Sequence, residues 1–338
     1  MAPLSEGCFF HSILPSELES ESVWGVNILQ LVGGLVILGC AGECLVRGSA
    51  QLARQMGVSA LVVGLTIVAF GTSAPEIAVT LQSAAIGEDD LAVANVIGSN
   101  ILNILIVLGI AAVVRPLRVS RNILTTDAPV MMFFTALFLL FAYDNNTINR
   151  WQGIFFIAAL AVYTVLTYRA ARRQPLVVES EYEEDLKVVP RPAWLNVLAV
   201  LIGFAGLVQG ADLIVEGAVG IAQRMGVSTR IIGLTIVALG TSLPELATGV
   251  IATRRNQSDI AIGNVVGSNI FNILAVVGVT STCYPLKVAP ETLRFDAPVM
   301  LFVTVLSFWV FRTGHRISRG EGFALIGIYV VYLAITLR

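Results

Sequence analysis

The amino-acid sequence predicts an all-α polytopic membrane protein with ten transmembrane helices, arranged as two inverted five-helix repeats. Three observations support this fold class. The chain of 338 residues is 56% hydrophobic and 13% charged, about half the share of charge in an ordinary soluble protein. Apolar runs of the roughly 20 residues that cross a bilayer recur along the whole chain. A long part of the sequence also occurs twice, at a constant offset of 169 residues.

The duplication is clearest in two motifs. Residues 56–76, MGVSALVVGLTIVAFGTSAPE, and residues 225–245, MGVSTRIIGLTIVALGTSLPE, are identical at 15 of 21 positions. The same offset relates NVIGSNILNIL (95–105) to NVVGSNIFNIL (264–274) without a gap. A duplication of this length indicates that the chain consists of two halves with the same fold.

We predict ten spans from the apolar runs, and the first five map onto the last five under this offset. A first repeat over 24–170 is followed by an acidic cytoplasmic linker over 171–192 and a second repeat over 193–338. Residues 1–23 form a polar N-terminal extension, since four glutamates and no Lys or Arg do not fit a secretory signal. The predicted spans are 24–46, 55–86, 90–113, 123–143, 150–170, 193–215, 224–253, 259–281, 294–312 and 320–337.

An odd number of spans in each half has a geometric consequence. The second half must enter the membrane from the opposite side, so the repeats are inverted, which is a recurring plan of secondary transporters. With the N-terminus outside, 15 of the 21 Lys and Arg residues fall on the cytoplasmic side, as the positive-inside rule requires. The short loops suit the plasma membrane of a prokaryote. The net charge of −2 gives no indication of nucleic-acid binding.

The second predicted span, 55–86, is longer than a bilayer requires and carries Gly71 and Pro75 near its middle. Glycine loosens a helix and proline removes a hydrogen-bond donor, so we expect the helix to break there. The seventh span repeats the pattern. A break frees backbone carbonyls, which are tolerated at membrane depth only inside protein or beside a cavity, and we expect those near Ala69 and Ala238 to be free.

Oxygen-bearing side chains collect around both predicted breaks. Glu76 and Glu245 place two carboxylates at membrane depth, where inserting an ionisable group costs at least about 2.5 kcal/mol, so we expect both to be functional. The set contains no His, Cys or Met, and oxygen ligands favour a hard cation such as Ca²⁺ over a soft transition metal. The candidate ligands are Glu76, Glu245, Thr72, Ser73, Thr241, Ser242, Ser99, Ser268, Asn103 and Asn272, with the carbonyls of Ala69 and Ala238.

Other polar residues in the spans have structural alternatives. Asp127 and Asp296 each precede an Ala-Pro pair, and we expect them to cap helices. Glu43 and Asp212 correspond under the offset and lie near span ends, which favours an interfacial position over an ion pathway. Four asparagines near the breaks either join the site or only satisfy broken backbone: Asn95, Asn100, Asn264 and Asn269.

The paired Gly-Thr-Ser-x-Pro-Glu and Gly-Ser-Asn-Ile-x-Asn motifs resemble the two alpha-repeats of the cation/Ca²⁺ exchanger superfamily, in particular those of the prokaryotic Na⁺/Ca²⁺ exchangers. The likeness covers roughly residues 25–337. It implies that the second, third, seventh and eighth of ten helices enclose the ions, with the candidate ligands above forming the site. Asn103 and Asn272 stand where K⁺-dependent exchangers carry Asp, which argues against K⁺ dependence. The proton/Ca²⁺ branch usually lacks the Thr-Ser pair, so protons are the weaker choice of driving ion.

We therefore expect Na⁺/Ca²⁺ antiport by alternating access, without a cofactor. The expected partners are Ca²⁺, Na⁺ and the lipid bilayer, and the oligomeric state stays open. Two alternatives remain, namely H⁺/Ca²⁺ exchange, in which the glutamates protonate, and a cation channel lined by acidic residues. We expect no enzymatic activity, because no nucleophile–base pair accompanies the carboxylates and both histidines, His11 and His315, lie in polar flanks.

Overall fold

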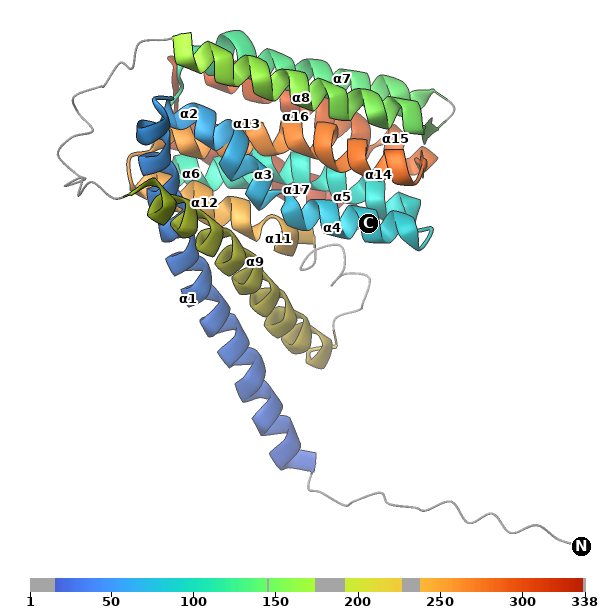
Figure 1. Cartoon of the computed structure of the whole chain (residues 1–338). Coiled ribbons are helices and arrows are strands. Elements are labelled where there is room, and N and C mark those ends of the chain that lie inside the picture. Colours follow the sequence, from blue (N-terminus) through green and yellow to red (C-terminus); the bar gives the residue numbers. More distant parts are fainter. Residues whose placement is uncertain (1–15, 145, 174–191, 227–237, 337–338) are drawn as a thin grey trace, which may run out of the picture.

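The computed structural model describes residues 16–144, 146–173, 192–226 and 238–336, which form a bundle of helices with four two-residue strands (Figure 1). The helices of the first half are α1 (Ser16–Met56), α2 (Ala60–Val63), η1 (Gly64–Val68), α3 (Ala69–Thr72), α4 (Ala74–Ala85), α5 (Asp89–Leu102), η2 (Asn103–Val107), α6 (Leu108–Val114), η3 (Ile123–Asp127), α7 (Ala128–Tyr143) and α8 (Arg150–Arg173). Those of the second half are α9 (Ala193–Arg224), α11 (Ala238–Thr241), α12 (Leu243–Arg254), α13 (Ser258–Phe271), η6 (Asn272–Val277), α14 (Gly278–Cys283), α15 (Pro290–Arg294), α16 (Asp296–Arg312) and α17 (Arg319–Thr336).

The described part of the chain is an all-helical membrane protein. Eight of its helices are long and apolar enough to cross a membrane, and the bent pair at 60–85 makes nine. The prediction of an all-α polytopic membrane protein is therefore confirmed, whereas the count of ten spans and the inversion of the repeats stay predictions. Residues 1–15, 174–191 and 227–237 lie outside the described residues, so most of the predicted N-terminal extension, the acidic linker and part of the seventh span stay predictions.

Two helices extend further than the predicted spans. α1 begins at Ser16, so residues 16–23 are the first turns of a helix rather than part of a separate extension. Glu and Leu in this segment are good helix formers, and a helix can continue past the hydrocarbon into water. α9 continues to Arg224, nine residues beyond the span predicted from hydropathy alone. Both helix ends contain polar residues, so a prediction from apolar runs did not include them.

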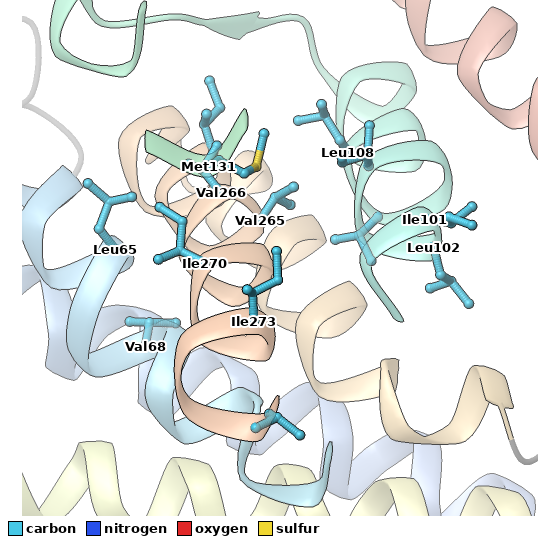
Figure 2. Packing of buried hydrophobic residues seen from close by; sticks show 14 of the residues in the cluster. Leu65, Val68, Ile101, Leu102, Leu108, Met131, Val265, Val266, Ile270 and Ile273 are labelled. Atoms are coloured by element: carbon cyan, nitrogen blue, oxygen red, sulfur yellow. The ribbon is translucent and has the colours of Figure 1, made fainter. Parts of the chain in front are cut away.

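Burial separates central helices from peripheral ones. The most apolar part of α13, η6 and α14 is wholly buried and that of α5, η2 and α6 is 78% buried, whereas those of α8 and α17 are 17% and 11% buried. Figure 2 shows Val265, Val266 and Ile270 of α13 among their neighbours, with Leu65 and Val68 of η1 beside them. The third and eighth spans thus form the interior, while α8 and α17 present apolar side chains to lipid.

The first and sixth spans, α1 and α9, pack along one another and lie to one side of the other helices (Figure 1). Glycines set their separation. A Cβ atom at Gly203 would lie 2.8 Å from the backbone N of Leu45, and one at Gly210 would lie 2.9 Å from that of Leu38. Small residues let membrane helices approach this closely, so the two helices form one tightly packed unit.

Two antiparallel strand pairs join the halves. Leu117 pairs with Ile317, and Ile148 pairs with Leu286. The offset of 169 residues carries Leu117 onto Leu286 and Ile148 onto Ile317, so both pairs represent the same pairing, made twice. All four side chains are fully buried. The strands are β1 (Leu117–Arg118), β2 (Thr147–Ile148), β3 (Leu286–Lys287) and β4 (Arg316–Ile317), in the pairs β1–β4 and β2–β3.

Candidate functional site

The helix breaks occur where the sequence predicts them. α3 ends at Thr72 and α4 begins at Ala74, with a bend of 41°. Ser73 between them has φ −83° and ψ 5°, and Ser242, between α11 and α12, has φ −95° and ψ 5°. This conformation lies between the helical and extended regions. The proline two residues later in each copy has no N–H to continue the preceding helix.

The carbonyl of Ala69 is not freed by this break, contrary to the expectation from the sequence. Ser73 N–H donates to Ala69 O at 3.0 Å. The donor that the motif removes is that of Pro75, and its acceptor in a regular helix is Gly71 rather than Ala69. Ala238 opens α11 directly after undescribed residues, so the role expected for its carbonyl stays a prediction.

The two glutamates occupy the first turns of the helices that follow the breaks. Glu76 in α4 and Glu245 in α12 are both 0% exposed and are close enough to interact electrostatically. Among the described residues, neither oxygen of Glu76 has a hydrogen-bond partner, and Oε2 of Glu245 has none either. Two adjacent buried carboxylates repel one another, so the pair requires a neutralising cation or proton.

Hydroxyl groups of the first half reach the carboxylate of the second. Thr72 and Ser73 lie beside Glu245, and Ser268 Oγ donates to Glu245 Oε1 at 3.5 Å. Thr72 Oγ1 lies 3.3 Å from Ser268 Oγ and donates to Asn264 Oδ1 at 3.1 Å. The fold therefore brings predicted ligands from both halves into one site.

Asn103 and Asn272 are the first residues of two π-helical segments, η2 and η6, and both are fully buried. Single π-helical turns within α-helices are frequent at functional sites. Within the described part of the chain, neither side-chain atom of Asn103 has a hydrogen-bond partner, and Oδ1 of Asn272 has none. Ser99, one helical turn before Asn103, is 3% exposed, so it lies in the interior on the same face.

Buried oxygens without a protein partner are concentrated at this site, while Ser49, Ser120 and Thr280 carry one each elsewhere in the described residues. Buried polar atoms are normally hydrogen-bonded, and an unpaired one costs about 1–3 kcal/mol. No three His, Cys, Asp or Glu side chains come together in the described residues, so a bound cation would depend on two carboxylates and neutral oxygens. Thr241 has an interaction within the protein. The unpartnered oxygens of predicted ligands are Glu76 Oε1 and Oε2, Glu245 Oε2, Ser73 Oγ, Ser242 Oγ, Asn103 Oδ1 and Asn272 Oδ1.

Sequence reasoning missed one polar residue beside this set, Thr248, and left the role of another, Asn264, open. Thr248 is fully buried, its hydroxyl has no partner among the described residues, and it follows Glu245 by three positions on the same helix face. Asn264 Nδ2 donates to the backbone carbonyl of Glu245 at 3.4 Å, as one alternative expected, but its Oδ1 accepts from Thr72. Spacing from Glu245 could have identified Thr248, whereas the contact of Asn264 with Thr72 joins two halves and leaves no local signal.

Asp127 and Asp296 lie outside this set, and the expectation that they cap helices is wrong. No side-chain capping bond forms at the start of α7 or α16. Tyr163 OH donates to Asp127 Oδ1 at 3.2 Å, and Tyr332 OH donates to Asp296 Oδ1 at 2.8 Å. The π-helical segment η3 runs into α7 at Asp127, so this position offers no free helix end to cap.

Glu43 is partly exposed and lies within α1 rather than at its end, so the interfacial position that the sequence favours stays a prediction. Its carboxylate forms ion pairs with Arg47 on α1 and with Arg255 just after α12. Asp212, its equivalent in the second half, is exposed. Neither residue therefore extends the buried site.

An all-helical membrane bundle with two buried carboxylates and a donor set made only of oxygen defines a membrane protein that handles hard cations. The family model of the "Sodium/calcium exchanger protein" matches residues 26–169 and 195–338, two stretches related by the same offset of 169. The chain belongs to this family, and its class of activity is cation/Ca²⁺ antiport.

Relatives of this chain extend over nearly its whole length. It is 36% identical over 310 residues to "Inner membrane protein YrbG" of Escherichia coli, covering 90% of this chain and 94% of that protein. It is 31% identical over 343 residues to "Sodium/calcium exchanger MaX1" of Methanosarcina acetivorans, covering 92% and 98%. The structure of the sodium-calcium exchanger NCX_Mj soaked with Na⁺ and Sr²⁺ matches with a TM-score of 0.79 at 28% identity, covering 91% of this chain and 98% of that one.

Proposed function

We propose that the protein exchanges Ca²⁺ for Na⁺ across the membrane by alternating access. The observation that carries this proposal is the buried pair Glu76 and Glu245, of which three carboxylate oxygens lack a partner in the described residues. An uncompensated buried charge costs several kcal/mol. Only cation-loaded states should therefore convert between the two sides, and an obligatory exchange of one cation for the other follows from this penalty.

We propose that one site binds Ca²⁺ and Na⁺ in competition. Two carboxylates match the charge of one Ca²⁺, and the neutral oxygens around them bring the ligand number toward the six to eight that Ca²⁺ takes. The carbonyl of Ala69 accepts a helical hydrogen bond and keeps a second lone pair for a cation, so the carbonyls of Ala69 and Ala238 stay candidate ligands beside this set. The proposed ligands are Glu76, Glu245, Thr72, Ser73, Thr241, Ser242, Ser99, Ser268, Asn103 and Asn272.

Na⁺ is favoured over H⁺ as the driving ion by the neutral oxygens. A proton needs only a carboxylate, whereas Na⁺ needs several oxygen ligands at once. The hydroxyls of Ser73 and Ser242 and the amide oxygens of Asn103 and Asn272 are buried without partners in the described chain, which a protonation site does not require. MaX1 and NCX_Mj are both named sodium/calcium exchangers, which supports the same choice.

The strand pairs support a count of ten spans. Because β1 pairs with β4, their two connections lie on the same side of the membrane, and the chain crosses an even number of times between them. Five described spans separate them, those of α7, α8, α9, α13 and α16. The stretch from α9 to α13, which contains α12, would then supply the sixth crossing.

The same pairs support inversion of the two repeats. One span, that of α7, separates β1 from β2, so β1 and β2 lie on opposite sides of the membrane. β3 pairs with β2 and is the equivalent of β1 in the second half. Equivalent connections of the two halves therefore lie on opposite sides. We propose a prokaryotic plasma membrane with the N-terminus outside, where Arg118 of β1 and Arg316 of β4 mark the cytoplasmic side.

Flux into proteoliposomes tests the function. Vesicles loaded with Na⁺ should take up ⁴⁵Ca²⁺ when diluted into Na⁺-free buffer, and vesicles with equal Na⁺ on both sides should not. Uptake driven equally well by an imposed pH gradient alone would replace Na⁺ with H⁺ as the counter-ion. Uptake that needs no counter-ion on the opposite side would point to a channel and refute exchange.

A further inference from the structure

The predicted ligand Asn272 differs from a carboxylate in one respect that matters for a cation. Its side chain ends in an oxygen, which attracts a cation, and an NH₂ group, which repels one. Only one of the two orientations of the amide therefore serves as a ligand. An Asp at this position would have no such requirement, because its two oxygens are equivalent. Some other group in the protein has to fix the orientation of Asn272.

Asn100 is that group in the structure. Nδ2 of Asn272 donates to Oδ1 of Asn100 at 3.1 Å, across the boundary between the two halves. Both residues are buried, with exposed fractions of 0% and 1%. With its nitrogen engaged, Asn272 presents Oδ1 as its free end, and this oxygen is buried without a partner in the described residues.

Met300 determines the direction of this hydrogen-bond chain. Nδ2 of Asn100 lies 3.7 Å from Sδ of Met300, which is fully buried in α16. A thioether sulfur accepts hydrogen bonds but cannot donate one. Asn100 must therefore turn its nitrogen to Met300 and its oxygen to Asn272. Reversing both amides would place an oxygen against the sulfur and leave the nitrogen of Asn272 facing the cation.

The three residues related to these by the sequence repeat do not form such a hydrogen-bond chain. Under the offset of 169, Met300, Asn100 and Asn272 correspond to Met131, Asn269 and Asn103. Asn269 Nδ2 donates to the backbone carbonyl of its own helix, at Val265, at 2.8 Å, and Oδ1 of Asn269 and both side-chain atoms of Asn103 lack partners in the described chain. The same residue types are present in both sets, so Met131, Asn269 and Asn103 supply a matched control.

We infer that Asn100 is a positioning residue, which directs the side-chain oxygen of Asn272 to the cation through a hydrogen bond whose direction Met300 sets. The inference rests on the proposed function in one respect, that Asn272 is a cation ligand. Asn100 itself does not touch the ion. Its role is to make an amide act in one orientation only.

A double-mutant cycle separates positioning from a merely structural role. Asn100→Ala should weaken equilibrium ⁴⁵Ca²⁺ binding to the purified protein about tenfold, the effect of losing a hydrogen bond worth roughly 1.4 kcal/mol. In an Asn272→Asp background the same change should weaken binding less than twofold, because a carboxylate needs no orientation. A tenfold loss in both backgrounds would overturn the inference. The effect of Asn269→Ala on Ca²⁺ affinity should be the same whether residue 272 is Asn or Asp. If it depended on residue 272 as strongly as the effect of Asn100→Ala does, the inference would also be overturned.

A milder pair of variants covers the case in which Asn100→Ala does not fold or Asn272→Asp does not bind. Met300→Leu keeps the volume of the side chain and removes the sulfur acceptor, so it should weaken Ca²⁺ binding about threefold, while Met131→Leu should leave it unchanged. Equal effects of the two would refute the role of Met300 and the positioning it supports. These variants are compared by equilibrium binding, which does not depend on the transport mechanism. If the wild-type protein binds Ca²⁺ but transports it without Na⁺, the proposed exchange is refuted, and the positioning role of Asn100 can still be tested.

Discussion

The two halves of the molecule carry nearly the same motif around their glutamates, yet they surround those glutamates differently. Glu245 accepts a hydrogen bond from Ser268 and lies beside Thr72 and Ser73. Glu76 is equally buried, and neither of its oxygens has a partner among the described residues. The repeat determines which atoms are available, whereas the conformation determines which of them meet.

The different surroundings of Glu76 and Glu245 make the site asymmetric although the two motifs are nearly identical. If both glutamates had the same surroundings, the site would be the same from both sides of the membrane. Instead Glu245 accepts a hydrogen bond from the hydroxyl of Ser268, and Glu76 depends on a cation.

The largest expected effect comes from removing either carboxylate. Glu76→Gln and Glu245→Gln should each reduce Na⁺-driven Ca²⁺ uptake at least about 100-fold, since one charge of a bound Ca²⁺ would then be left uncompensated in a buried site, which costs roughly 3–5 kcal/mol. The two variants should differ in unfolding temperature when a chelator keeps the protein free of Ca²⁺. Glu76→Gln removes a charge without partners and should raise the unfolding temperature more than Glu245→Gln does. Equal stabilisation by both variants would contradict the asymmetry between the two glutamates.

A smaller effect should separate hydroxyls with and without partners. Ser73→Ala and Ser242→Ala should weaken Ca²⁺ binding about threefold to tenfold without destabilising the cation-free protein, because their hydroxyls have no hydrogen bond to lose in the described structure. Ser268→Ala should weaken binding and also lower the free energy of unfolding by about 1 kcal/mol. Thermal unfolding with and without Ca²⁺ measures both quantities. A loss of cation-free stability in Ser73→Ala would show that its hydroxyl is engaged.

The tyrosine–aspartate pairs test stability away from the site. Tyr163→Phe and Tyr332→Phe each remove the donor to a carboxylate oxygen, at Asp127 and Asp296, and should cost about 1 kcal/mol of unfolding free energy. Tyr163 is 6% exposed and its partner is the more buried aspartate, so its substitution should cost more. Equilibrium unfolding in mixed micelles measures this. Ca²⁺ affinity should not change, and a loss of affinity would place these pairs in the cation pathway.

The smallest effect concerns the ion pair between Glu43 of α1 and Arg255, just after α12. Arg255→Gln removes an ion pair with Glu43 that is partly exposed, so it should cost less than about 1 kcal/mol and the cost should vanish in high salt. Asp212→Asn, at the equivalent place in the second half, should have no measurable effect. A large loss of transport in Arg255→Gln at unchanged stability would mean that the pair controls access to the site.

Much of the architecture could be predicted because it depends on local composition and on a repeat. Apolar runs located the spans, and Gly71 with Pro75 located the break at Ser73 to within a few residues. The polar ends of α1 and α9 were missed, since hydropathy locates only the apolar part of a helix and not the turns that continue beyond it. The role predicted for Asp127 was wrong because Ala-Pro after an Asp indicates a helix start, whereas π-helical backbone already precedes this position.

The composition of the site could be predicted, but its connections could not. Type and spacing identified Glu76 and Glu245, because a duplicated carboxylate in an apolar run stands out in one dimension. The bond of Asn272 to Asn100 and that of Thr72 to Asn264 join residues more than 170 positions apart. Such contacts depend on how the halves interlock, which neither the motif nor its offset specifies.

The four short strands also restrict the motion of the molecule. Each half is fastened to the other at both rims of the bundle, through β1–β4 at one rim and β2–β3 at the other. Two bodies fastened at both ends cannot rock like a hinge, so the helices outside α1 and α9 should behave as one frame. Neither α1 nor α9 is adjacent in sequence to these strands, and the two helices lie to one side and pack mainly on each other. We therefore expect them to slide together across a stationary frame, so that a disulfide between β1 and β4 would leave transport intact, whereas one between α1 and α12 would arrest it.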